Sequence, residues 1–338
     1  MGLDRLGRLE AFLEEDPGNA SLLGEAFDVA LQLRQLDRAA ALVERAGRRD
    51  AAWCYRSAVV QALRGDPAAA LADLREAARD LPAPWPAAVQ VLWLRLHHQL
   101  GHLEEAWQWI EAARPALDAT AAGVASLIAI DLERFSDALS LAEQALVLEA
   151  PPAEALVARG TVALAQRDVQ AAKQWLHAAR QDPSAAGRAS SALGYASLLE
   201  QDLAGAVSNL AVAVQRLPQH IGSWLGLGWA RLLQGERDAA LDTFRRALEL
   251  DPAFGESQAA VGLVLAMLGD PGAAEHLERA ERLDRGGVTA RYARALLAGE
   301  AAELGQLQRL AQRILGHEAP LGGRLSDWLV PPRSGRSG

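Results

Sequence analysis

The stretch GWARLLQGERDAALDTFRRALELDP, residues 228–252, decides the fold of this chain. Its apolar residues recur at spacings of three and four on both sides of the polar turn QGERD, a pattern that predicts two short amphipathic helices. Pro252 ends the second helix because proline has no amide hydrogen and disfavours helical backbone at the residue before it. Gly228 is unexpected, since glycine inside a helix costs about 1 kcal/mol relative to alanine. A neighbouring element should therefore need the space that a side chain would fill.

The same features return at a fixed period. Four glycines are each 34 residues apart, namely Gly160, Gly194, Gly228 and Gly262. Five alanines follow the same period of 34, namely Ala138, Ala172, Ala206, Ala240 and Ala274. Such a period indicates stacked structural repeats, here one pair of helices each. Antiparallel helices about 8–10 Å apart need small residues where they cross, so we interpret these glycines and alanines as contact points within each pair.

The unit SWLGLGWARLLQGERDAALDTFRRALELDP, residues 223–252, resembles a tetratricopeptide repeat (TPR). The residues that carry the resemblance are Trp224, Leu227, Gly228, Gly235, Ala240, Phe244, Ala247 and Pro252. Arg231 departs from the family's preference for tyrosine. The resemblance is fullest over residues 150–284 and less complete over residues 20–150. It implies an all-α fold, a right-handed α-solenoid of antiparallel helix pairs, with the first helix of each pair on the concave face.

The repeats predict the domain organisation. We expect a capping helix in residues 1–18 and eight TPR-like helix pairs in residues 19–284, which begin near residues 20, 51, 87, 119, 153, 187, 221 and 255. Residues 285–317 should form a degenerate hairpin, and residues 318–338 a tail with disordered last residues. Two alternatives stay open for the apolar segment LSDWLV, residues 325–330: it caps the last hairpin, or it occupies a groove of this or another copy.

The residues assigned to the concave face predict where a ligand binds. Matching the first helices to the TPR pattern places a set of apolar and aromatic residues on this face: Tyr195, Leu198, Leu225, Trp229, Leu232, Leu263 and Met267. Such a groove fits an apolar helix or peptide of a partner protein, with about 1.5–3 kcal/mol for each large side chain that is buried. The alternative is that Trp229 and Tyr195 pack against the neighbouring pair.

Towards the N terminus the same positions become mixed in character. They hold Asp28, Tyr55, Val59, Arg95 and His98, which allows polar contacts as well as solvated charges. TPR proteins that clamp a terminal carboxylate use lysine and asparagine at these positions. Here Lys173 lies on a second helix, and both asparagines lie off the concave face, so that ligand mode is excluded.

The densest group of titratable residues is LHHQLGHLEEAW, residues 96–107. His98 and His102 have the spacing that lets two imidazoles share a metal on one helix. Because Gly101 and His102 fall in a predicted turn, that spacing does not apply, and we interpret these histidines as solvent-exposed. No phosphate-binding loop, strand or nucleophile motif is recognisable. We therefore predict no enzyme, no cofactor and no metal.

Composition and charge restrict the classes of partner and the cellular location that we expect. The formal charge of −9 opposes a phosphate backbone, so we expect no nucleic acid, and a helical array that reads RNA would need a basic groove. The uncharged stretches are too short for membrane insertion. The single cysteine, Cys54, allows no intramolecular disulfide, and no signal peptide is visible, so we expect a cytoplasmic protein. The preference for arginine over lysine indicates a GC-rich bacterial genome.

These observations predict a non-enzymatic scaffold for protein–protein interaction, an adaptor or chaperone-like factor that holds an apolar helix or peptide of another protein. The alternative is a self-associating structural protein, and thus a homo-oligomer, for example in a secretion, pilus or envelope assembly pathway.

Overall fold

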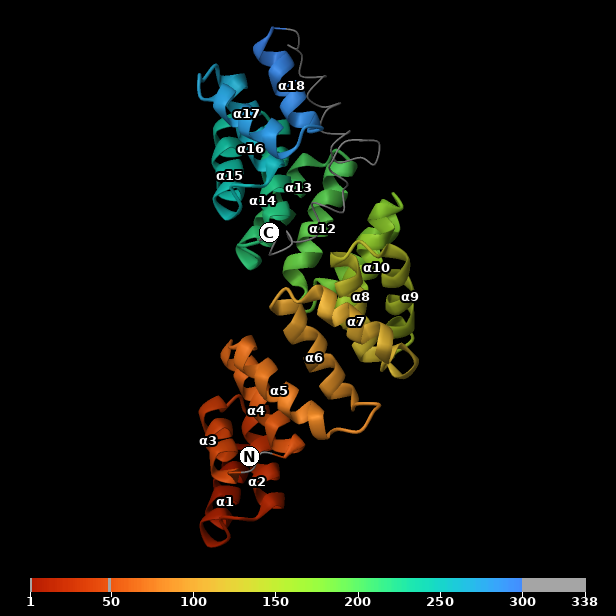
Figure 1. The fold of residues 1–338 in the computed structure, drawn as a ribbon, viewed down its shortest axis with the longest axis vertical. Helices are drawn as coiled ribbons and strands as arrows, with labels where there is room; N and C mark the ends of the chain where they lie inside the picture. Colours follow the sequence, from red (N-terminus) through yellow and green to blue (C-terminus); the bar gives the residue numbers. More distant parts are fainter. Residues whose placement is uncertain (1, 48–49, 300–338) are drawn as a thin grey trace. The chain divides into compact units, whose positions relative to one another are not determined.

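The structure is a computed structural model that describes residues 2–47 and 50–299. Every regular element in these residues is helical, α1–α18 and one short 3-10 helix (Figure 1). None of the described helices has the length and apolarity that a membrane crossing requires. The chain divides into two compact units, residues 1–124 and the residues from 125 onward, with the boundary inside α8. The predicted tail, its segment 325–330 and most of the predicted hairpin lie outside the described residues.

The helices follow one another in pairs. Unit 1 contains α1 (Gly2–Glu15), α2 (Ala20–Gln32) with α3 (Leu36–Ala46), α4 (Ala51–Arg64) with α5 (Pro67–Asp80), α6 (Ala87–Gln99) with α7 (Leu103–Ala113), and the 3-10 helix η1 (Arg114–Ala116). The pair α8 (Ala119–Asp131) and α9 (Phe135–Leu146) begins at the boundary. Unit 2 continues with α10 (Ala153–Ala165), α11 (Val169–Ala179), α12 (Ala186–Leu199), α13 (Leu203–Arg216), α14 (Ile221–Leu233), α15 (Arg237–Leu250), α16 (Gly255–Leu268), α17 (Ala273–Leu283) and α18 (Val288–Leu297).

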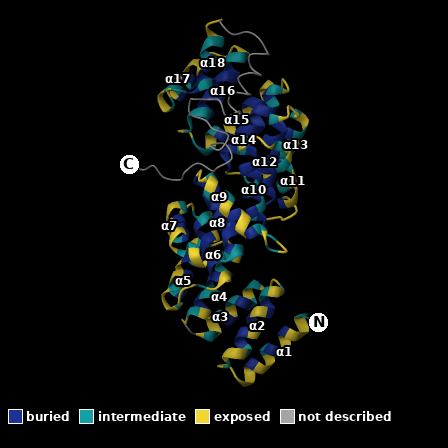
Figure 2. Ribbon diagram, turned by 90° about the vertical axis from the view of Figure 1, so that its right-hand side faces the viewer, coloured by how far each residue is buried: buried dark blue, intermediate teal, exposed yellow. Residues whose placement is uncertain are grey.

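This architecture confirms the predicted fold class, an all-α solenoid built from antiparallel helix pairs. The first helices of the eight pairs begin within one residue of the positions expected from the sequence. Their burial also follows the repeat. In unit 2, α12, α14 and α16 are buried along most of their length, whereas α13, α15 and α17 keep one exposed face (Figure 2).

The repeat glycines lie where a large side chain of the second helix meets the first. A Cβ atom added to Gly228 would lie 2.3 Å from Cε1 of Phe244 on α15, far inside van der Waals contact. Gly194 would meet Leu210 at 2.4 Å in the same way. The missing side chain of Gly228 is thus replaced by the aromatic ring of the partner helix. Gly160 and Gly262 have the same relation to Leu176 and Leu277.

The repeat alanines line the same contact, with one exception. Four of the five predicted alanines are fully buried, namely Ala138, Ala172, Ala206 and Ala240. Ala274 is exposed, and Ala273 takes the buried place instead. The reason is the turn before α17, in which the buried alanine comes four residues after Gly269, whereas Ala240 comes five residues after Gly235.

The turn inside each pair contains one residue in the left-handed conformation, and from Glu133 onward these residues recur at the period of the glycines. In the last two pairs this residue is glycine, Gly235 and Gly269, with φ of 88° and 71°. In the three preceding pairs it is Glu133, Arg167 and Gln201, with φ of 59°, 62° and 63°. Because a Cβ atom is strained in this region, these three positions carry a conformational cost that glycine avoids.

The contact between Gly228 and Phe244 predicts a strong coupling between the two positions. Gly228→Ala should lower the free energy of unfolding by about 1–3 kcal/mol because the new methyl group overlaps the ring. Phe244→Ala should lower it by about 3–5 kcal/mol through the cavity it leaves. In the Phe244→Ala background the methyl group finds space, so Gly228→Ala should then cost nothing. Urea unfolding of the four proteins measures this coupling, and additive losses would contradict the proposed contact.

The left-handed turn residues predict a stabilising substitution. Arg167→Gly should raise the free energy of unfolding by about 0.5–1 kcal/mol, since glycine adopts the positive φ without strain. Gln166, the preceding residue, has φ of −83° and serves as the matched control. Gln166→Gly should lower stability, because glycine gains freedom there only in the unfolded chain. Thermal melts of both variants check the opposite signs.

Candidate functional site

The structure places the predicted apolar groove residues in the core of unit 2. The side chains with at most 6% exposure are Tyr195, Leu198, Leu225, Trp229, Leu232 and Leu263. Met267 is half-buried. A side chain without exposed area offers no surface to a ligand, and a peptide-binding role for these residues stays a prediction.

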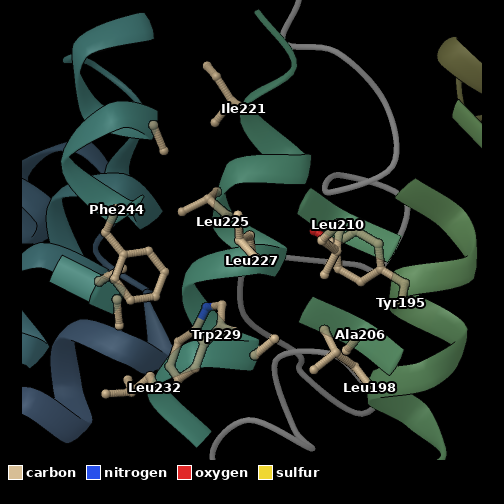
Figure 3. Close-up of a cluster of buried hydrophobic side chains, with 14 of the residues drawn as sticks. Tyr195, Leu198, Ala206, Leu210, Ile221, Leu225, Leu227, Trp229, Leu232 and Phe244 are labelled. Carbon is tan, nitrogen blue, oxygen red and sulfur yellow. The ribbon is translucent and has the colours of Figure 1, made fainter. Parts of the chain in front are cut away.

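The contacts of Tyr195 and Trp229 are those of interior residues (Figure 3). The Tyr195 hydroxyl on α12 donates a hydrogen bond to the carbonyl oxygen of Gly222 on α14, at 2.6 Å. Burial raises the pKa of Tyr195 well above its ordinary value. The Trp229 ring meets the edge of the Phe244 ring at a centroid distance of 5.9 Å. Tyr195 thus contacts the neighbouring pair, as the packing alternative expected, whereas Trp229 contacts the second helix of its own pair.

Polar side chains near the end of α8 and the beginnings of α12 and α14 form hydrogen bonds with one another. Arg188 donates two hydrogen bonds, both at 2.8 Å, to the fully buried carboxylate of Asp131. The Ser223 hydroxyl donates to Ser191 at 2.9 Å and lies 2.6 Å from Nδ1 of His220. The cavity beside them measures about 10 Å³, which is close to the space of one water molecule. This part of unit 2 therefore has no space for a side chain of a ligand.

An open pocket lies in unit 1, between α2 and α4. Its volume is about 370 Å³. The residues that line it are Phe27, Asp28, Leu31, Ala52, Tyr55, Arg56 and Val59. This depression, which we call the α2–α4 pocket, therefore combines an acidic side chain, Asp28, and a basic one, Arg56, with an apolar wall.

Arg56 is the principal charged group of this pocket. Its guanidinium carbon lies 4.8 Å from the centre of the Trp53 ring and 5.5 Å from that of Phe27. Within the described residues Arg56 forms no ion pair. Gly24 faces Arg56, and a Cβ atom there would lie 3.1 Å from Nη2, so the glycine leaves room for the guanidinium. Cation–π contacts with two rings restrict the guanidinium while its N–H groups remain available.

The other polar groups lie on either side of Arg56. Asp28 is exposed and has no ion-pair partner among residues 2–47 and 50–299. Tyr55 is half-buried, and burial raises the pKa of its hydroxyl. Cys54, which precedes Tyr55 in α4, is buried in the interior of the unit.

The sequence predicted part of this pocket. Asp28, Tyr55 and Val59 were expected on the inner face, and the structure brings all three together. Arg95 and His98, expected on the same face, lie on α6 and do not line the pocket. Four further lining residues were not predicted: Phe27, Leu31, Ala52 and Arg56. The i,i+4 spacing of Phe27 and Leu31, and of Ala52 and Arg56, was a usable signal for them.

The histidine-rich segment differs from its predicted exposure. His98, expected to be exposed, is half-buried, whereas His102 is exposed in the turn as expected and is the N-cap residue of α7. The neighbouring His97 is fully buried in α6. Burial lowers the pKa of His97 to about 4, and Glu105 opposes part of that shift. The imidazole of His97 is therefore neutral at physiological pH. Glu104 is exposed.

Comparison with known proteins supports the repeat assignment at one helix pair. A family model described as "Tetratricopeptide repeat" matches residues 221–254, the pair α14–α15. No curated protein matches the chain.

Several solved structures are similar to this chain. YrrB, a TPR protein with an unusual peptide-binding site, is 21% identical, with 55% of this chain and 96% of YrrB covered and a TM-score of 0.42. MamA of AMB-1 is 24% identical over 48% of this chain and 89% of its own, with a TM-score of 0.39. The Cut9–Hcn1 hetero-tetramer of APC/C is 14% identical over 89% of this chain and 53% of its own, with a TM-score of 0.45.

Four of the helix pairs, from α10–α11 to α16–α17, share the glycine contact and the left-handed turn, and the pair at residues 221–254 matches the family model. Residues 221–254 are therefore a tetratricopeptide repeat within an all-α solenoid of antiparallel helix pairs.

Proposed function

We propose that this protein is a non-enzymatic interaction scaffold that holds a short segment of a partner protein in the α2–α4 pocket. The observation that carries the proposal is the open pocket in which Arg56, in cation–π contact with two aromatic rings, has no acidic partner within the described residues. An adaptor or chaperone-like role in the cytoplasm belongs to the same proposal.

The pocket suits an apolar side chain next to a carboxylate. Its volume of about 370 Å³ is within the range of sites that enclose small ligands. Phe27, Leu31 and Val59 offer apolar surface for burial, and Arg56 offers two parallel N–H groups that match the oxygens of a carboxylate. A hydrogen bond to a charged group contributes about 1.5–3 kcal/mol, so Arg56 should supply a large part of the affinity.

Asp28 should fix the direction in which a peptide segment binds. Its exposed carboxylate accepts hydrogen bonds, so it pairs with a backbone amide or a basic side chain of the bound segment. Because Arg56 and Asp28 carry opposite charges, a segment that fits in one direction meets like charges when reversed. We therefore expect bound peptides to contain an acidic residue beside an apolar one. The Tyr195–Met267 region is not part of this proposal, since most of its side chains are buried.

The prediction is that a random peptide library, displayed on phage and selected on the full-length chain, yields sequences with an acidic residue beside an apolar one. Arg56→Gln should weaken binding of a selected peptide by about 10–100-fold, which corresponds to the loss of one charge-assisted hydrogen bond. Arg79→Gln, an exposed arginine near the end of α5, is the matched control and should leave affinity unchanged. Fluorescence anisotropy with labelled peptide measures both.

Thermal melts accompany the binding data, because a loss of fold would also reduce binding. Arg56→Gln should melt within a few degrees of the unaltered chain. Selected peptides without an acidic residue, or equal binding by the Arg56 variant, would place the interaction elsewhere on the protein.

A further inference from the structure

The turn between α6 and α7 brings three metal-ligating side chains together. One ligand atom each of His97, His102 and Glu105 lies within 4.8 Å of the other two. Nδ1 of His97 is 3.8 Å from Oε2 of Glu105, and the two imidazole rings are 5.7 Å apart between centroids. This geometry does not depend on the α2–α4 pocket.

His97 is the fixed member of the cluster. Its side chain is fully buried, and neither ring nitrogen meets a partner at regular hydrogen-bond geometry, although the His102 backbone interacts with the ring. The ring packs against Trp93, with the centroids 4.5 Å apart, so its orientation is restricted. A buried polar group without a partner is unfavourable, and a neutral imidazole nitrogen in that situation is well suited to accept a metal ion.

His102 and Glu105 are the adaptable members. Both are exposed, and the His102 side chain makes no capping hydrogen bond to α7. Oε1 of Glu105 accepts a hydrogen bond from Arg75 at 2.7 Å, whereas Oε2 faces His97. The Arg75 contact orients the carboxylate in the way that outer partners orient metal ligands. Its positive charge and the N-terminus of α7 both oppose a cation, so the affinity should be moderate.

We propose that His97, His102 and Glu105 bind one Zn²⁺ ion, with a water molecule as the fourth ligand. Two imidazoles and one carboxylate form a common zinc ligand set. Bonds of about 2.0–2.2 Å in tetrahedral geometry bring ligand atoms to about 3.3 Å from one another. The two exposed side chains supply the small movement needed, while His97 stays in place. The ion would link the end of α6 to the beginning of α7.

The prediction is tested by isothermal titration of the full-length chain with ZnCl₂. One Zn²⁺ per chain should bind, and the melting temperature should rise with Zn²⁺ concentration. His102→Ala and Glu105→Gln, both at exposed positions, should each weaken binding at least about tenfold. Glu104→Gln and His177→Ala are the matched controls, since both residues are exposed and outside the cluster, and they should bind as the unaltered chain does.

Trp93 gives a second readout, because it lies against His97. Zn²⁺ should change tryptophan fluorescence with the same midpoint as the titration, and Trp93→Phe should remove most of that change. The proposal is wrong if the unaltered chain does not bind Zn²⁺, or if the His102 and Glu105 variants bind it as tightly as the controls.

Discussion

The contact between a glycine on one helix and a large side chain on the next is the constraint on which unit 2 depends. In four pairs, α10–α11, α12–α13, α14–α15 and α16–α17, the side chain of Leu176, Leu210, Phe244 or Leu277 occupies the space where a Cβ atom would otherwise lie. This interlock sets how closely the two helices approach. It also explains why the first helices are almost wholly buried, since they pack against their own partner on one side and against neighbouring pairs on others.

Helix order and helix starts could be predicted because their signals are local. The period of the glycines, the polar turns and the X-Pro steps each act within a few residues, so the eight pairs follow directly from the chain. Ala274 is a position at which the local pattern predicts the wrong buried residue. A fixed period cannot register a turn that is one residue shorter, and only the packing of α16 against α17 selects Ala273 for the buried position.

The binding surface was harder to predict, because a repeat pattern gives the face of a helix but not the distance to the next pair. Gly222 and Gly226 lie on the side of α14 that meets α12, and a Cβ atom at Gly226 would come within 3.0 Å of the Tyr195 ring. These glycines allow Tyr195 to enter the core instead of facing a ligand. In unit 1, Arg56 lies five residues after the start of α4, as Gly226 does after the start of α14, and it lines a depression together with Phe27 and Tyr55. The i,i+4 glycines were visible in the sequence, but their effect depends on the neighbouring pair.

The thiol of Cys54 can report how often helix α4 opens. Cys54 is buried in α4, directly before Tyr55 and Arg56, two of the residues of that helix that line the α2–α4 pocket. A thiol reagent reaches it only when α4 transiently separates from its surroundings. Since the chain has no other cysteine, the labelling rate reports the opening frequency of this one helix without any engineered tag. A ligand that holds α4 in place should slow that rate, whatever its chemical identity.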